Sequence, residues 1–134
     1  HDFTNKNIEP IINIEENIPN IISDETALTR IFTNLINNML KHGKDTVIIN
    51  LAQKKDKLVA EFINHAPDLQ QDQISHIFDR FFTGDRARSN KNTGLGLYIA
   101  KTLAEQLGHE IGAELIDETL KITVSFSINS KREP

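Results

Sequence analysis

Apolar residues recur at helical spacing in two separate segments of this chain. A helical period runs through residues 24–42 and returns at 96–107, and strand-like segments follow each helix. The order of strand, helix, hairpin, short helix, loop, helix and hairpin contains no repeated βαβ unit. It predicts an α+β two-layer sandwich, in which helices pack on one face of a mixed, mostly antiparallel sheet. The predicted strands are residues 7–14, 46–52, 57–63, 110–117 and 120–128, and the short helix contains Ile74, Ile77 and Phe78.

Capping and turn residues set the ends of these elements. Ser23 and Asp24 are good N-cap residues for the first long helix, and Gly43 is suited to end it. Residues 53–56 are expected to form a polar turn between the first two hairpin strands. Residues 64–69 are expected to form a loop after the second of these strands.

Length and composition limit both the architecture and the partners. The 134 residues suffice for one domain with its own core. The formal net charge of −4 argues against binding to nucleic acid, and the lack of cysteine excludes disulfides and thiolate metal sites. No apolar run reaches the roughly 20 residues that cross a bilayer, so no direct membrane contact by this domain is expected.

Two glycines stand one residue apart at the start of the second long helix. Apolar residues at helical spacing follow Gly94 and Gly96 without a breaker until Gly108. A glycine-bearing helix N-terminus offers free N–H groups and the positive end of the helix dipole to an anion such as phosphate, although a plain turn is the alternative. No G-K-[ST] follows the pair and no βαβ unit contains it, so neither a P-loop nor a Rossmann site is expected.

The first long helix carries amides on or beside its apolar stripe. Asn34 and Asn38 are four residues apart and share a face, and Lys41 and His42 lie one turn further on. An amide oxygen is a hard ligand that suits Mg²⁺, and a lysine suits a phosphate oxygen. The alternative is that these are polar residues at the edge of the stripe.

An almost wholly polar run precedes the glycine pair. Residues 83–92 include Arg86, Arg88 and Lys91, and we interpret the run as a mobile loop. Its cations could close as a lid over a polyphosphate, or the run could be a solvated surface loop.

Four segments, in this order, resemble the ATP-binding domain of bacterial sensor histidine kinases, within the wider group that includes gyrase, Hsp90 and MutL. The resemblance runs from about Ile8 to Ile128 and implies the Bergerat fold, with a mobile ATP lid at about residues 80–93. The segments match that family's N-box (LTRIFTNLINNMLKH, 28–42), first glycine box (NHAPDL, 64–69), F-box (IFDRFF, 77–82) and second glycine box (TGLGL, 93–97).

The resemblance implies an ATP site with bound Mg²⁺. Asn38 would be the Mg²⁺ ligand, Lys41 and His42 would lie near the phosphates, and Asn34 would be a polar neighbour. Asn34, Asn38 and Lys41 form the expected catalytic group. The expected nucleotide-binding residues are Asn38, Lys41, His42, Asn64, Ala66, Leu69, Phe82, Arg86, Arg88, Thr93, Gly94, Leu95, Gly96 and Leu97.

The F-box and the polar run are expected to act together as the lid. In the family, the F-box phenylalanines anchor the lid, which implies this role for Phe78, Phe81 and Phe82. The position after them, often arginine in the family, is a threonine here. Arg86 or Arg88 would therefore supply the positive charge of the lid.

The chain departs from the family pattern at the adenine end. The first glycine box usually reads D-x-G-x-G, and its aspartate accepts a hydrogen bond from the adenine amino group. Asn64, Ala66 and Asp68 stand at these positions. An asparagine oxygen can still accept that bond, but it carries no charge and accepts more weakly. Asn34 stands where ATP-hydrolysing relatives carry a glutamate; an amide cannot act as a base, which favours transfer to a protein over hydrolysis.

The resemblance implies the catalytic domain of a sensor histidine kinase, which passes the γ-phosphoryl to a histidine on a separate dimerisation domain and works with a response regulator. Such proteins are usually anchored in the bacterial cytoplasmic membrane with this domain in the cytoplasm. None of the five histidines lies in an H-E-x-[KR]-x-P helix, so the chain alone is expected to bind nucleotide without phosphorylating itself. Phosphoacceptor and sensor domains are expected to lie outside it. The alternatives are a degenerate module that acts in docking and a serine kinase of the anti-sigma-factor type.

Overall fold

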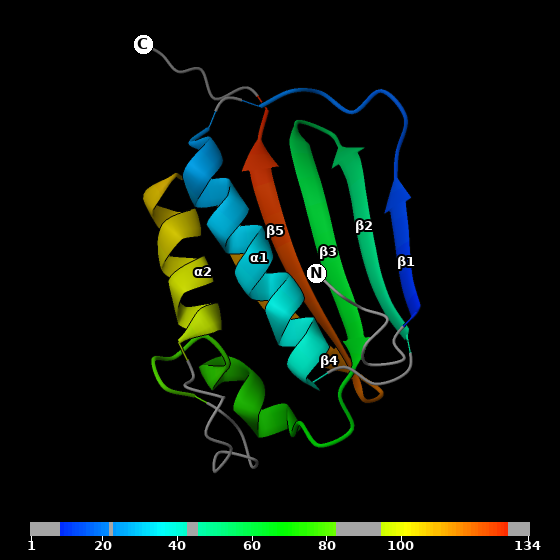
Figure 1. Ribbon diagram of the computed structural model, residues 1–134, viewed down its shortest axis with the longest axis vertical. Coiled ribbons are helices and arrows are strands. Elements are labelled where there is room, and N and C mark those ends of the chain that lie inside the picture. The colour runs from blue at the N-terminus through cyan, green and yellow to red at the C-terminus, as the bar shows by residue number, and fades with distance from the viewer. Residues whose placement is uncertain (1–8, 22, 43–45, 83–94, 129–134) are drawn as a thin grey trace.

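The computed structural model describes residues 9–21, 23–42, 46–82 and 95–128 (Figure 1). Its strands form one five-stranded sheet in the order β1-β2-β3-β5-β4. β1 runs parallel to β2, and the other three neighbouring pairs are antiparallel. The predicted fold class, a mixed and mostly antiparallel sheet in an α+β domain, is therefore confirmed. The strands are β1 (Glu9–Ile14), β2 (Thr46–Lys54), β3 (Lys57–His65), β4 (Glu110–Ile116) and β5 (Thr119–Ser127).

The helices lie on one face of this sheet. α1 (Glu25–His42) and α2 (Gly96–Gln106) run side by side across it, and the short 3₁₀ helix η2 (Gln71–His76) lies at one end (Figure 1). The short helix ends earlier than predicted, because Ile77 and Phe78 follow η2 in a turn. None of the helices in the described part of the chain is long and apolar enough to cross a membrane.

The sequence of α1 explains both its start and its orientation. Asp24 caps the helix, since its Oδ1 accepts a hydrogen bond from the backbone N–H of Ala27 at 3.0 Å. Ile31, Leu35 and Met39 recur at every fourth residue and are at most 1% exposed. This single apolar stripe packs α1 onto the sheet.

Aromatic rings join α1 to the central strands. The ring of Phe32 lies 5.7 Å from that of Phe62 on β3 and 5.9 Å from that of Phe126 on β5, measured between centroids. Buried residues alternate with less buried ones along β5 and along β3 from Ala60 onward, as a half-covered sheet requires, whereas residues 58–60 of β3 are all buried. The core therefore lies between the two long helices and the middle of the sheet.

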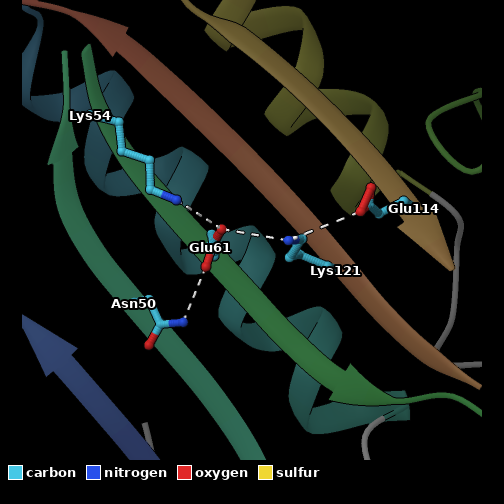
Figure 2. A network of polar contacts seen from close by, with 5 residues as sticks. All are labelled: Asn50, Lys54, Glu61, Glu114 and Lys121. Carbon is cyan, nitrogen blue, oxygen red and sulfur yellow. Dashed lines mark hydrogen bonds and ion pairs between the residues drawn. The ribbon is translucent and has the colours of Figure 1, made fainter. Parts of the chain in front are cut away.

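The face of the sheet away from the helices carries a polar chain that crosses all five strands, and Figure 2 shows the part of it from Asn50 on β2 to Glu114 on β4. Asn13 Nδ2 donates to Asn50 Oδ1 at 2.8 Å, and Asn50 Nδ2 donates to Glu61 Oε1 at 3.1 Å. Lys121 Nζ lies 3.6 Å from Glu61 Oε2 and 4.0 Å from Glu114 Oε2. The hydrogen bond from Asn50 and the ammonium groups of Lys121 and Lys54 together hold the pKa of the Glu61 carboxyl below its ordinary value.

The first hairpin is longer than predicted. β2 and β3 pair up to Lys54 and Lys57, so the turn consists of two residues, 55 and 56, in place of 53–56. At its other end β3 continues through Asn64 and His65, which were predicted to belong to a loop. They remain in the strand because both pair with β5, His65 with Thr119.

A buried histidine joins the start of α1 to the start of β4, far from the end where η2 lies. His109 is 8% exposed, and its ring packs edge-on against Phe126 with 4.7 Å between centroids. Its Nε2 lies 2.9 Å from the hydroxyl oxygen of Ser23. Burial lowers the pKa of the His109 imidazole because the charged form loses its hydration.

We predict that this burial makes the fold sensitive to acid. The unfolded chain takes up a proton on His109 near the ordinary pKa of about 6.5, whereas the folded protein resists it. The unfolded state thus binds more protons in this range, and the free energy of unfolding falls as the pH drops below about 6.5. Urea titrations at about pH 7.5 and about pH 5.5 measure the loss.

His109→Gln should reduce this loss of unfolding free energy, because glutamine is polar and does not titrate. His76→Gln provides the control, since His76 is exposed and the variant keeps His109. If the free energy of unfolding falls equally between about pH 7.5 and about pH 5.5 in the wild-type protein and in His109→Gln, the burial of His109 is not the cause of the acid sensitivity.

Candidate functional site

Three element ends meet at one end of the molecule. The carboxyl ends of α1 and β3 and the amino end of α2 lie together at the lower end of Figure 1, next to η2. The fold therefore brings the N-box helix, the first glycine box and the start of the second glycine-box helix to one place. This is the region in which the sequence predicted a site.

The N-box amides lie beside the buried stripe of α1. Asn34 and Asn38 are partly buried and directly precede Leu35 and Met39, which are fully buried. Nδ2 of Asn34 is buried and donates to no described residue. Lys41 is exposed in the last turn of the helix, and His42 is its final residue. An unpaired buried donor costs about 1–3 kcal/mol, which makes Asn34 a strong candidate for contact with a ligand.

Asn64 is the most deeply buried polar residue of this end. It is 2% exposed and lies at the end of β3. Its Nδ2 donates to the carbonyl oxygen of His65 at 3.1 Å, and its Oδ1 is buried and accepts from no described residue. The amide thus presents one acceptor, with an orientation fixed by the carbonyl. Such an atom suits an amino group of a ligand.

The other first-box residues form a compact corner after β3. Ala66 is buried, and its carbonyl oxygen accepts from the backbone N–H of Leu69 at 3.1 Å. Leu69 packs against the core, and Asp68 is exposed. Ala66 and Leu69 therefore offer an apolar wall at this end.

The F-box phenylalanines divide into two groups. Phe78 and Phe82 pack against the core, as expected for anchors. Phe81 does not pack there, since it is 59% exposed and has a φ of 66°, and its contact with the lid stays a prediction because the lid lies outside the described residues. Its left-handed backbone turns the side chain outward, where the guanidinium of Arg80 lies 5.2 Å from the ring centroid.

The amino end of α2 is open to a ligand. Leu95 is the N-cap residue and provides no side-chain hydrogen bond to the first turn, which also lacks an acidic residue. Gly96 is exposed, and a Cβ built on it would meet no atom within 4 Å, whereas Leu97 packs against the core. Leu95 therefore leaves the first N–H groups of α2 without a side-chain cap of its own, and such groups favour an anion.

The sequence did not predict that two cationic side chains, Arg80 and Lys101, contact aromatic rings at α2. The guanidinium of Arg80 lies 5.8 Å from the ring centroid of Tyr98, in the first turn of α2, and Lys101 Nζ lies 5.3 Å from that of Phe78. The F-box motif of the sequence contained Arg80, but its position relative to α2 depends on tertiary packing. Arg80 adds positive charge next to the amino end of the helix.

Four expected nucleotide-binding residues lie outside the described residues. They are Arg86, Arg88, Thr93 and Gly94, and with them most of the predicted lid. Within the described ranges there is no group of three or more histidine, cysteine, aspartate or glutamate side chains that could hold a metal ion.

Comparison with known proteins identifies the relatives of this arrangement. The family model described as "Histidine kinase-, DNA gyrase B-, and HSP90-like ATPase" matches residues 23–131. The signal transduction histidine-protein kinase AfsQ2 of Streptomyces coelicolor is 37% identical over 92 residues, which cover 68% of this chain and 17% of AfsQ2. The sensor histidine kinase WalK of Bacillus subtilis is 29% identical over 134 residues, which cover 96% of this chain and 22% of WalK.

A solved structure shares the fold. The catalytic domain of the histidine kinase ThkA superimposes with a TM-score of 0.80 at 20% identity, covering 94% of this chain and 82% of that domain. The chain thus corresponds to about a fifth of the length of AfsQ2 and WalK, and to most of an isolated catalytic domain.

We predict that Gly96 is a glycine because a ligand approaches it, since the fold itself leaves room for a side chain. Gly96→Ala should keep or slightly raise the free energy of unfolding, by up to about 1 kcal/mol, because alanine is the better helix former. The affinity for Mg-ATP should fall about tenfold, equal to about 1.4 kcal/mol. Calorimetric titration and thermal unfolding measure the two effects.

Gly112→Ala is the matched control. Gly112 lies on β4, and a Cβ there also meets no atom within 4 Å. Its substitution should leave the affinity for Mg-ATP unchanged. If both variants bind ATP as the wild-type protein does, the ligand does not approach Gly96.

Proposed function

The chain belongs to the family of histidine kinase-, DNA gyrase B- and HSP90-like ATPases, and we propose that it binds Mg-ATP where α1, β3 and α2 converge and serves as the catalytic domain of a sensor histidine kinase. The observation that carries this proposal is the buried Oδ1 of Asn64, which accepts from no described residue. A buried acceptor of fixed orientation at the end of β3 is suited to an adenine amino group.

Adenine is placed at the first glycine box. The 6-amino group donates to Asn64 Oδ1, and the ring lies against the apolar wall of Ala66 and Leu69. This pairing offsets the desolvation of Oδ1, which otherwise costs about 1–3 kcal/mol. The end of the sheet thus distinguishes the base, whereas the helix ends hold the charged part of the nucleotide.

The phosphates are placed between α1 and α2. Backbone N–H groups at the amino end of α2, at Leu95, Gly96 and Leu97, face the phosphate oxygens, with Thr93 and Gly94 preceding them in the sequence. Lys41, from the opposite helix, provides a positive charge, and His42 a further polar contact. Arg80 provides a cation on the lid side, and Arg86 and Arg88 close over the phosphates as the lid.

Asn38 is the protein ligand of Mg²⁺. The ion usually keeps several waters and binds through substrate phosphates and one or two protein oxygens, so a single amide oxygen is enough. Bound Mg²⁺ supplies neutralisation of the charge on the phosphates. The partly buried Asn38 holds its amide at the edge of the α1 stripe, and Asn34 lies one turn before it.

The acceptor of the phosphoryl group is a histidine outside this chain. Sensor histidine kinases are the relatives of this chain, which covers only about a fifth of their length. Asn34 has no basic group that could activate water, so the site positions ATP for transfer and leaves hydrolysis slow. The histidine belongs to a dimerisation domain, a response regulator receives the phosphoryl group, and the domain works on the cytoplasmic side of a membrane-anchored sensor.

Asn38→Ala tests the metal ligand. Affinity for Mg-ATP should fall about 10–100-fold, the order seen when a metal site loses a supporting group, while thermal unfolding stays close to that of the wild-type protein. Asn37→Ala is the matched control, since Asn37 is the preceding residue of the same helix and is exposed. Unchanged affinity in a folded Asn38→Ala variant would remove the assignment.

A phosphorylation assay tests the reaction. The chain alone, incubated with ATP labelled at the γ-phosphate, should bind the nucleotide and gain no label. Addition of a histidine-bearing dimerisation domain from a relative should give a phosphoryl group that is labile in acid and stable in base. Acid-stable label would favour the serine kinase, and no heat on titration with millimolar ATP would favour a docking module.

A further inference from the structure

The hairpin turn between β4 and β5 adopts an unfavourable backbone conformation. Asp117 and Glu118 are its two central residues and have φ angles of 50° and 65°. A two-residue turn with positive φ at both positions prefers glycine or asparagine. Aspartate tolerates the left-handed region through its short side chain, but glutamate gains no such local compensation. A glutamate at this position suggests that its contacts matter more than its conformation.

Glu118 holds the segment that follows the end of β3. Its carbonyl oxygen accepts from the backbone N–H of Ala66 at 2.7 Å, which extends the pairing of β3 with β5 beyond His65. Its side-chain Oε1 lies 3.3 Å from Nε2 of His65. One residue thus contacts two consecutive residues of the first glycine box.

These contacts lead directly to Asn64. The carbonyl of His65 accepts the hydrogen bond from Asn64 Nδ2 and so leaves Oδ1 as the acceptor that the amide presents. If the His65 peptide rotated, the amide would lose the partner that fixes its orientation. Glu118 opposes that rotation through two contacts. Its carbonyl oxygen holds the Ala66 N–H, which belongs to the same peptide group, and its side chain holds the His65 ring.

We propose that Glu118 is a positioning residue for adenine recognition, which acts through His65 and Ala66 on the amide of Asn64. The inference rests on the proposed function, since it assumes that Asn64 receives the adenine amino group. It predicts an effect on ATP that GTP does not share, because guanine has no 6-amino group to donate.

Glycine substitutions at the two turn positions separate binding from stability. Both Glu118→Gly and Asp117→Gly relieve the left-handed conformation, so neither should lower the temperature of unfolding. Glu118→Gly also removes the contact with His65 and should weaken ATP binding about two- to fivefold, the range of an exposed side-chain contact, without changing GTP binding. Asp117→Gly should bind both nucleotides as the wild-type protein does.

Two further variants test the route. Glu118→Gln keeps an oxygen that accepts from His65 and should restore most of the ATP affinity. His65→Ala should cause the same loss as Glu118→Gly, and the double variant should lose no more than either single one, since both break one contact.

The outcomes are distinct. Equal ATP affinity in Glu118→Gly and Asp117→Gly would overturn the positioning role. A loss of GTP affinity in Glu118→Gly equal to its loss of ATP affinity would do the same. Either result would leave the proposal that the chain binds ATP unaffected. Additive losses in the double variant would overturn the route through His65. A wild-type protein that binds no ATP would overturn the proposed function and this inference with it.

Discussion

The burial of one stripe of α1 against the sheet is the constraint on which the rest of the structure depends. Ile31, Leu35 and Met39 are at most 1% exposed, and burial of each contributes roughly 1.5–3 kcal/mol. A rotation of the helix about its axis would expose all three, so packing fixes the rotation. Asn34 and Asn38, each one residue before a buried side chain, are held at the edge of the interface. The same packing that stabilises the fold thus positions the amides of the candidate site.

The candidate ligand site lies at one end of the sheet and on neither of its two faces. The inner face is covered by α1 and α2, and the outer face carries polar groups that pair with one another, with Glu61 in the middle. Charged groups that already pair with one another on a solvated face offer little binding free energy to a ligand. They also contribute less to the free energy of unfolding than the core does. By contrast, three buried side-chain atoms have no partner among the described residues: Asn34 Nδ2 on α1, Asn64 Oδ1 near the end of β3, and His109 Nδ1 at the opposite end. Asn64 Oδ1 is the one of the three that lies where α1, β3 and α2 converge, and a ligand donor there would offset its desolvation.

The sequence predicted what depends on local pattern and missed what depends on distant contacts. The helical stripe of α1 and the existence of the strands β3 and β5 were predicted because local patterns in the sequence mark them. The extension of β3 to His65 was missed, since it depends on pairing with Thr119, 54 positions further along the chain. The exposure of Phe81 was missed because phenylalanine carries no signal for a left-handed backbone. Glu118, which contacts His65, showed no motif at all.

The uncharged amide at position 64 changes the energetics of the adenine end. Asn64 is 2% exposed, so a carboxylate there would lose its hydration, and one of its oxygens would face the His65 carbonyl that now accepts from Nδ2. The amide satisfies that carbonyl with its donor and still presents an acceptor. A carboxylate accepts more strongly but needs other groups to compensate for its charge. With the amide, the strength of adenine recognition depends on how firmly its orientation is held, and so on the residues that hold the His65 peptide in place.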